Sequence, residues 1–511
     1  MHNEFLTTNY IRPLNWFFGA VLFIYSTVIL CFLTFGGFDF HIIGIRIKIT
    51  SLEKPAVIFT SLAFLYIITI PHWRFFKGIY GSARKLTAPV VIILALGLAI
   101  RLVYLSYTDF NTRTHDVIGH INYIEHIVIN NNLPYRGECW QCFHPPLYYS
   151  MAAGVYHIMS FIGVERDNMW VKLQLLSIIL FMIFLYYSAL LMKHYIRPRY
   201  FYMMGAALLV FWPAGVMHSV RIGNDAMLYP VYAAGLYYLV EWHKEGRTRD
   251  LYISTILGSA TLAIKTNGLV LLGVIGIVIL FRLIVGSNRK DTFKKIAVMA
   301  VIVSIGASIG LYRTVSEKYA GKKENWLVGN VHQLPPEIYV GNDIGNFLYF
   351  DIATFVNKPF TDPWDDDYGR QFFFNFLLKT GLFTENQINL KLNRATALTM
   401  SSLLLIFLAF SLYYILTMNK DKFAELGIIF LNALLLLAAA IVFRIKIPAA
   451  CSNDFRYILP ILISLVVVLI KSVENLHQKN YTKIGYAGQA GIWIFIVSSI
   501  TFLINPSISN Q

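Results

Sequence analysis

The chain has 511 residues, of which 57% are hydrophobic and only 14% are charged, and its mean hydropathy is +0.57. A soluble domain this apolar would expose too much hydrophobic surface, so the composition excludes an ordinary soluble protein and indicates a polytopic membrane protein. The formal net charge of +15 does not indicate a nucleic-acid partner, because the basic residues lie in short loops between apolar runs, as positive-inside topology requires.

The apolar runs predict an all-α bundle. A membrane-spanning helix needs roughly 20 mostly apolar residues, and by this measure we predict about 13 transmembrane helices. The first run lacks a signal-peptide cleavage site, so we interpret it as a span. The predicted spans are 14–34, 56–71, 87–107, 171–192, 200–217, 226–241, 251–264, 268–285, 294–312, 396–417, 424–443, 455–471 and 487–504.

One apolar segment, 146–161, is ambiguous. If it lies along the membrane surface, the basic loops of the chain all fall on the same side of the membrane; if it crosses, most of them move to the other side. The positive-inside rule therefore favours a juxtamembrane helix. With this choice the N-terminus is cytoplasmic and the C-terminus is not.

We divide the chain into four parts. Residues 1–86 carry two extra N-terminal helices, and 87–312 form a transmembrane core whose first outer loop is 108–170. Residues 313–395 form a long non-cytoplasmic loop, expected to be ordered because it is rich in Trp, Phe, Tyr and Asp, and 396–511 carry the C-terminal helices.

The first outer loop is unusually long and polar. Its apolar residues recur at helical spacing and predict an amphipathic helix on the membrane, with Asp116 in the first turn (Val117, Ile121, Ile124, Val128). A carboxylate at a helix start is favoured by the helix dipole and needs no catalytic role. A general base is the alternative reading of Asp116.

Metal binding stays open. His115 and Asp116 are adjacent and could help to bind a divalent ion such as Mg, Mn or Zn, whereas His120 and Glu125 match no known metal-ligand spacing. Four aspartates in the long loop could bind a hard cation or form a solvated acidic turn, and their spacing is not that of an EF-hand (Asp362, Asp365, Asp366, Asp367).

Two further features follow in the same loop. Cys139 and Cys142 could form a disulfide, remain free thiols, or bind a metal together with His144. His144 is followed by two prolines, which suit the entry to a helix.

Charged residues recur at the outer ends of later apolar runs. Asp225 opens the span at 226–241, Lys265 lies in the turn before 268–285, and Arg456 and Tyr457 open the span at 455–471. Charges at such positions are functional candidates, although interface snorkelling is the plain alternative. Because Lys and Arg bind phosphates, the set is typical of a site that handles a phosphate at the membrane surface. No phosphate-binding loop or dinucleotide fingerprint occurs, so we expect no nucleotide cofactor.

At these residues the chain resembles the GT-C glycosyltransferases of the protein mannosyltransferase and aminoarabinose transferase type. The resemblance covers roughly 87–471 and consists of short motifs in a characteristic order: an early acidic residue, a K/H-P-P-like stretch, an outer Asp, a K-x-x-G turn and a late R-Y-x-x-P (Asp116, His144–Tyr149, Asp225, Lys265–Gly268, Arg456–Pro460). The chain departs from the mannosyltransferases in having His-Asp where they have Asp-Glu.

The resemblance implies a GT-C-like fold and a transferase that takes a sugar from a polyprenyl-phosphate carrier and passes it to a hydroxyl of a glycan, lipid or protein. Asp116 would be the general base and Asp225 would orient the acceptor or share that role. His144, Lys265, Arg456 and Tyr457 would bind the donor phosphate. The expected location is a bacterial inner membrane, with the active site on the periplasmic side.

Two other functions remain possible. A glycan ligase or polymerase would use similar carriers, and a lipid or sugar transporter would place polar residues near the middle of the membrane. Here the polar residues cluster towards one face, which counts against transport.

Overall fold

The computed structural model describes residues 38–42, 45–49, 86–107, 116–285, 289–319, 331, 334–385, 390–478 and 481–509. Within these ranges the chain is helical apart from one antiparallel hairpin, β1 (Phe38–Ile42) and β2 (Ile45–Ile49), in which Phe38 pairs with Ile49. The all-α prediction did not include this hairpin. The predicted spans 14–34 and 56–71 lie outside the described residues.

The α-helices before the long loop are α4 (Ala88–Ser106), α5 (Val117–Asn130), α6 (Leu147–Phe161), α7 (Met169–Lys193), α8 (Arg199–Val210), α9 (Pro213–Ser219), α10 (Asp225–Glu245), α11 (Thr248–Leu262), α12 (Leu269–Val285) and α13 (Arg289–Tyr319). Those that follow are α14 (Ile344–Leu348), α15 (Ile352–Asn357), α16 (Phe373–Phe383), α17 (Lys391–Thr417), α18 (Lys420–Glu425), α19 (Gly427–Lys446), α20 (Ile461–Gln478) and α21 (Thr482–Ser509). Short 3-10 helices are η1 (Arg166–Asn168), η2 (Thr266–Gly268), η4 (Pro336–Ile338), η5 (Asp366–Tyr368), η6 (Ala450–Asn453) and η7 (Phe455–Ile458).

Among the described residues, eight helices are long and apolar enough to cross a membrane, and α8 with α9, bent by 52°, makes a ninth when the two are taken as one span. The chain is therefore an integral membrane protein. The predicted spans at 226–241 and 251–264 do form helices, but α11 has only 15 residues and neither α10 nor α11 meets the same measure. The predicted count of 13 is thus not confirmed.

Successive long helices alternate in direction. Asp225 begins α10, Lys265 follows α11, and Arg456 precedes α20, so these three residues lie at one end of the bundle. At the opposite end, Lys244 Nζ donates to the His194 carbonyl oxygen at 2.9 Å, and the Arg282 guanidinium lies over the Trp242 ring. The basic turns and the candidate site residues therefore occupy opposite ends, as the charge pattern predicts.

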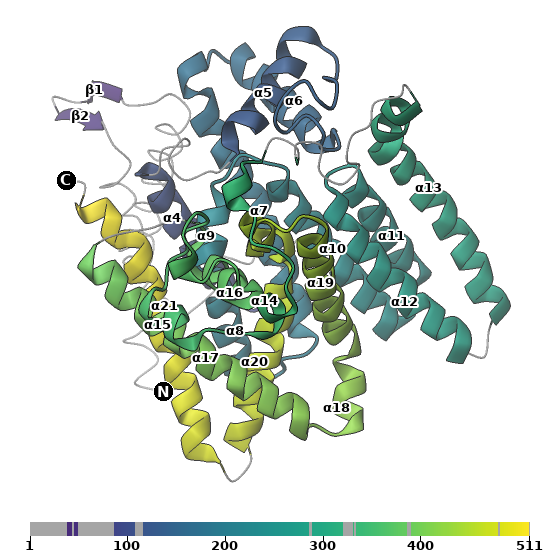
Figure 1. The fold of residues 1–511 in the computed structure, drawn as a ribbon, viewed down its shortest axis with the longest axis vertical. Helices are drawn as coiled ribbons and strands as arrows, with labels where there is room; N and C mark the ends of the chain where they lie inside the picture. The colour runs from purple at the N-terminus through teal and green to yellow at the C-terminus, as the bar shows by residue number, and fades with distance from the viewer. Residues whose placement is uncertain are drawn as a thin grey trace, which may run out of the picture.

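α5 and α6 lie together at the top of Figure 1, at one end of the bundle. They share a core in which the predicted apolar stripe of α5 packs on Tyr148, Tyr149, Ala152 and Ala153 of α6. α6 has only 15 residues and packs against α5, which agrees with a surface helix and not a span.

The described part of the long loop folds over the same end of the bundle. α13 continues to Tyr319, beyond the predicted end of its span, and α16 packs against α9, η6 and η7. Buried Arg370 joins two loop segments, since its Nη1 donates to the carbonyl oxygens of Glu337 (2.8 Å) and Pro363 (2.6 Å). The described part of the loop is therefore joined both to the bundle and across its own segments.

α13 lies at the edge of the bundle and packs closely against α11 (Figure 1). Gly306 and Gly310 are four residues apart and face α11, a spacing that lets two membrane helices approach closely. Ser259 Oγ donates to the Ile302 carbonyl oxygen at 2.8 Å across this contact. A Cβ at Gly310 would overlap the Leu262 carbonyl oxygen, so the contact depends on glycine.

Gly310→Ala should therefore lower the free energy of unfolding by about 1–3 kcal/mol, because the backbone of α11 cannot move aside for the added methyl group. The measurement is the thermal unfolding midpoint in detergent. Gly276→Ala on α12 is the control, since a Cβ there has no neighbour within 4 Å. Equal midpoints for the two variants would contradict this description of the α11–α13 contact.

Candidate functional site

Six of the residues singled out in the sequence line one cavity of about 590 Å³ at the end of the bundle covered by α5 and α6 (Asp116, His144, Asp225, Lys265, Arg456, Tyr457). They come from segments far apart in the chain. The packing of α10, α11 and α20 therefore gathers residues that the sequence shows only as separate motifs. His115 lies outside the described residues.

Asp116 is positioned by an unusual backbone conformation. It precedes α5 as the N-cap residue with φ 63° and ψ 4°, in the left-handed region, which Asp tolerates better than most residues. Its side chain makes no cap hydrogen bond. The sequence predicted Asp116 in the first turn of the helix, but Asp116 lies one residue before that turn. Because its side chain makes no cap hydrogen bond, helix capping does not explain why a carboxylate occupies this position.

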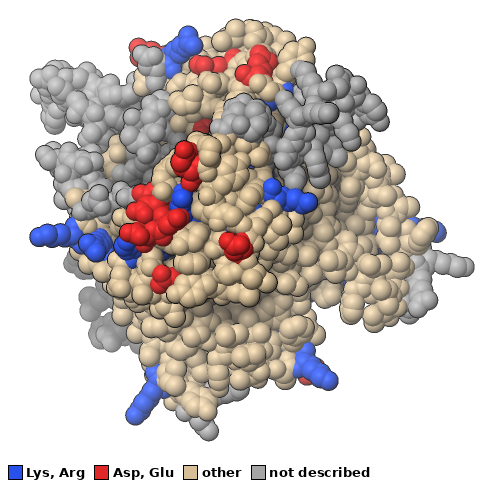
Figure 2. Space-filling view, in the orientation of Figure 1, with Lys and Arg blue, Asp and Glu red and all other residues tan. Residues whose placement is uncertain are grey.

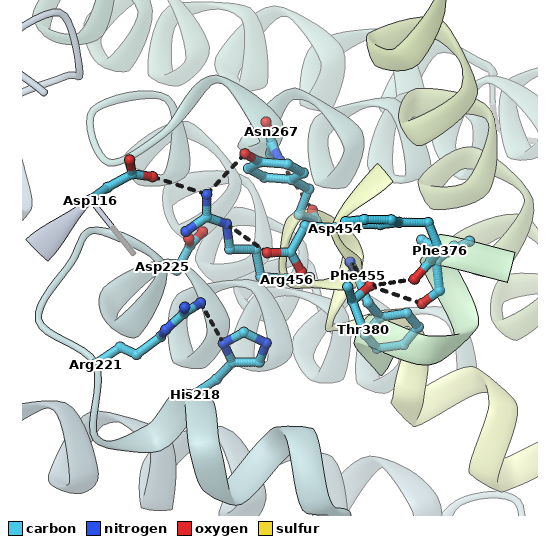
Figure 3. Close-up of polar contacts among 12 residues, drawn as sticks. Asp116, His218, Arg221, Asp225, Asn267, Phe376, Thr380, Asp454, Phe455 and Arg456 are labelled. Carbon is cyan, nitrogen blue, oxygen red and sulfur yellow. Dashed lines mark hydrogen bonds and ion pairs between the residues drawn. The ribbon is translucent and has the colours of Figure 1, made fainter. Parts of the chain in front are cut away.

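The Asp116 carboxylate is held by two donors. Trp140 Nε1 donates to Oδ1 at 3.0 Å. Arg456 Nη2 donates to Oδ2 at 3.1 Å (Figure 3). The second contact is an ion pair between partly buried side chains. The carboxylate thus faces the cavity with both oxygens engaged.

Arg456 is fixed from the other side by Asp454. Figure 3 shows Arg456 between Asp116 and Asp454, and its Nε lies 3.1 Å from Asp454 Oδ2. Arg456 Nη2 also donates to the Tyr457 hydroxyl at 3.1 Å, and the Tyr229 hydroxyl donates to the Arg456 carbonyl oxygen at 2.9 Å. Arg456 and Tyr457 lie in η7, before α20 starts at Ile461, so the prediction that they open the spanning helix is corrected.

The second charge pair joins Lys265 and Asp225. Lys265 Nζ donates to Asp225 Oδ1 at 2.7 Å and lies 5.0 Å from the centroid of the Tyr457 ring. Asp225 is the first residue of α10, and Lys265 precedes η2 in the turn between α11 and α12. The Tyr457 ring therefore lies near both cations, because Arg456 Cζ is also 5.0 Å from its centroid.

His144 lines the cavity, and its ring is stacked 6.2 Å from that of His120. His120 Nδ1 is 2.8 Å from the Tyr149 hydroxyl. Burial, followed by nearby cations, lowers the pKa of His144 well below its usual value, and burial lowers the pKa of His120 to about 4. Both rings are consequently neutral near pH 7, so His144 can donate a hydrogen bond to a phosphate but contributes no positive charge.

The charges of the site also shift the carboxyl groups. Burial acts to raise the pKa of Asp116, but Arg456, His120 and the Trp140 hydrogen bond outweigh it and hold the pKa at about 2. Burial raises the pKa of both Asp454 and Glu385 above the usual range. Asp116 is therefore the strongly ionised acid among these three.

The donor set does not fit a metal centre within the described ranges. No group of three His, Cys, Asp or Glu side chains there is arranged to hold an ion, and Asp116 and Asp225 are each paired with a cation. The acidic turn of the long loop is not such a group either, because Asp365, Asp366 and Asp367 are exposed and Asp366 pairs with Arg370 at 2.7 Å. Figure 2 shows acidic side chains gathered in a red patch on the face in view.

Cys139 and Cys142 are joined in a disulfide, which closes a short loop around Trp140. Cys139 Sγ is also close to the Gly119 carbonyl oxygen on α5. This loop presents the Trp140 indole to Asp116. Of the alternatives considered for these cysteines, the structure contains the disulfide.

The cavity has an apolar wall below its charged end. α12 contributes Leu269 and Val270, and α19 contributes residues along one face (Leu436, Ala439, Ala440, Val442, Phe443). Both helices are long and apolar enough to span a membrane. The cavity therefore joins a charged region at the end of the bundle to a surface suited to an aliphatic chain.

Sequence reasoning missed several cavity residues. Trp140 was passed over between the two cysteines, and Glu385 carried no local signal. Asp454, which contacts Arg456 from behind the cavity, was also overlooked although its segment is unusually polar. A smaller adjoining cavity is lined by His218 and Arg221, which contact each other at 3.2 Å (Figure 3). The polar link 218–225 was the available signal for these two residues.

No family model matches the sequence, and no curated protein matches it. Among solved structures, the chain is similar to ArnT from Cupriavidus metallidurans bound to undecaprenyl phosphate, with a TM-score of 0.35 and 13% sequence identity. The match covers 75% of this chain and 76% of ArnT.

The ionised state of Asp116 predicts a pH effect on stability. Because its folded-state pKa is about 2, below the usual value of 3.8, the stabilisation is present above the usual pKa and is lost as pH falls towards 2. Wild type should therefore be more stable than Asp116→Asn at pH 6, and the difference should shrink below about pH 4. Unfolding midpoints in detergent across this range test it; a difference independent of pH would contradict the assignment.

Proposed function

We propose that this protein is an integral-membrane glycosyltransferase that moves a sugar from a polyprenyl-phosphate-linked donor to a hydroxyl acceptor on the non-cytoplasmic face. The observation that carries the proposal is the lining of the larger cavity. Two carboxylate–cation pairs lie at its charged end (Asp116 with Arg456, Asp225 with Lys265), and an apolar wall of spanning helices continues from them. A lipid phosphate has the matching combination of an anionic head and an aliphatic tail.

The donor phosphate would bind at Arg456 and Lys265. Both cations lie near Tyr457, whose ring centroid is 5.0 Å from Lys265 Nζ and from Arg456 Cζ. Arg can contact a phosphate through two N–H groups, whereas Lys acts as a point charge. His144 would add a neutral donor, the Tyr457 hydroxyl would add a hydrogen bond, and the polyprenyl tail would lie along α12 and α19.

Asp116 and Asp225 would then act on the acceptor. A carboxylate removes the hydroxyl proton while the acceptor oxygen attacks the anomeric carbon, and the bond from that carbon to the phosphate oxygen breaks. The electron pair of that bond leaves with the phosphate, where Arg456 and Lys265 stabilise the developing charge. We assign the base role to Asp116 and the orientation of the acceptor to Asp225.

The acceptor would enter past the long loop. Pro335, Ile338, Pro363 and Trp364 line the outer part of the cavity, and Arg370 holds the two loop segments that carry them. These residues supply apolar and aromatic surface that suits a glycan, a lipid or a peptide alike. A bacterial inner membrane, with the site facing the periplasm, fits a donor of this class.

The proposal predicts that Asp116→Asn and Asp225→Asn each lower turnover by about 10²–10⁴-fold, because each removes a carboxylate needed for proton transfer or acceptor placement. The assay offers purified protein a panel of polyprenyl-phosphate sugars and measures release of polyprenyl phosphate. Asp367→Asn is the matched control, since this carboxylate is exposed and lies outside the cavity lining. Wild-type rates in both test variants would refute the site assignment.

Release of a whole glycan would instead indicate the ligase or polymerase. If wild type neither binds nor turns over any member of the panel, the glycosyltransferase proposal fails and transport becomes the leading alternative.

We propose a reaction without a metal, since each cavity aspartate has a cationic partner before the donor binds. Turnover should consequently survive treatment with EDTA followed by desalting. Loss of activity that Mg²⁺, Mn²⁺ or Zn²⁺ restores would show that a metal takes part after all. Thermal midpoints before and after chelation separate a catalytic metal from a structural one.

A further inference from the structure

Each cation proposed to bind the donor phosphate is already paired with one of the two catalytic carboxylates. Arg456 Nη2 lies 3.1 Å from Asp116 Oδ2, and Lys265 Nζ lies 2.7 Å from Asp225 Oδ1. Both pairs line the same cavity. The charges that the reaction needs therefore cancel one another before any substrate binds.

Exposure indicates which partner of Arg456 can be replaced. The Asp116 side chain is 28% exposed, whereas that of Asp454, on the other side of the guanidinium, is 1% exposed. Asp454 Oδ1 also accepts the Arg456 backbone N–H at 2.9 Å, so Asp454 is fixed within the protein. A ligand that enters the cavity can reach the Asp116 side of Arg456 and leaves the Asp454 contact in place.

A phosphate is a strong competitor for that side. The phosphodiester of the donor presents two non-bridging oxygens that share a negative charge, and both can accept charge-assisted bonds from a guanidinium. Lys265 is in the same position, because its partner Asp225 is 21% exposed while Lys265 itself is 8% exposed. A phosphate in this cavity could therefore replace the carboxylate partner of Arg456 and that of Lys265.

We propose that the donor phosphate displaces Asp116 from Arg456 and Asp225 from Lys265, so that donor binding itself releases the carboxylates to act on the acceptor. This inference rests on the proposed function. It adds an order to the reaction: the donor binds first, and only then is a carboxylate available for the acceptor hydroxyl. Without the donor, Arg456 and the Trp140 hydrogen bond hold Asp116 as a poor base.

The exchange has a consequence that a simple phosphate site does not have. Removing the negative charge of Asp116 removes the competitor for Arg456, so Asp116→Asn should bind polyprenyl phosphate on the order of tenfold more tightly than wild type, even though it does not turn over. A variant that loses catalysis and gains affinity for the leaving carrier is the expected signature.

A double-mutant cycle separates exchange from a general electrostatic effect. Polyprenyl phosphate of defined length is titrated into four proteins in detergent: wild type, Asp116→Asn, Arg456→Gln and the double variant. Exchange predicts a gain from Asp116→Asn in the wild-type background and none in the Arg456→Gln background. If Arg456→Gln does not give a folded, monodisperse protein, Arg456→Lys replaces it. In the Arg456→Lys background, Asp116→Asn is then expected to increase the affinity for polyprenyl phosphate less than it does in the wild-type background.

Two results would overturn the inference. An equal gain in both backgrounds would mean that Asp116 merely repels the phosphate at a distance, and no gain in either would mean that Asp116 does not compete for Arg456. If wild type does not bind polyprenyl phosphate at all, the underlying proposed function fails, and this result is distinct from the other two.

Discussion

The ion pair between Asp116 and Arg456 is the contact on which the rest of the site depends. It joins the start of α5 to the 3-10 turn before α20, two segments 340 residues apart in the sequence. Asp454 and Tyr457 hold the arginine, and Trp140 holds the aspartate. Because a buried charge is costly unless it is paired, this contact requires the outer loop to close over the end of the helix bundle.

Two further contacts hold the outer loop against the end of the bundle. The disulfide between Cys139 and Cys142 keeps Trp140 against α5, and the α6 backbone is tied to the bundle where Leu147 N donates to the Ala263 carbonyl oxygen at 3.0 Å. Lys265 lies two residues beyond that carbonyl. Both charge pairs thus lie near the same junction between the outer helices and the helix bundle, above the apolar wall formed by α12 and α19.

Sequence patterns predicted much of this because a charged residue at the end of an apolar helix is costly and therefore informative. Asp225, Lys265 and Arg456 stood out for that reason, and the basic turns gave the direction of each helix. The pairing of Asp116 with Arg456 could not be predicted, because it depends on how α5 packs over η7. The span count was not confirmed for two reasons. The predicted spans 14–34 and 56–71 lie outside the described residues, and α10, which is rich in tyrosine, and α11, which is short, do not meet the measure of length and apolarity used for the other helices.

The most direct test of the central claim is an experimental structure of the protein with polyprenyl phosphate bound. We expect the phosphate to lie within hydrogen-bond distance of Arg456 and Lys265, and the polyprenyl tail to follow α12 and α19. Asp116 should have separated from Arg456, and Asp225 from Lys265. A phosphate bound elsewhere, or one bound in the cavity while both carboxylate pairs remain intact, would contradict the central claim.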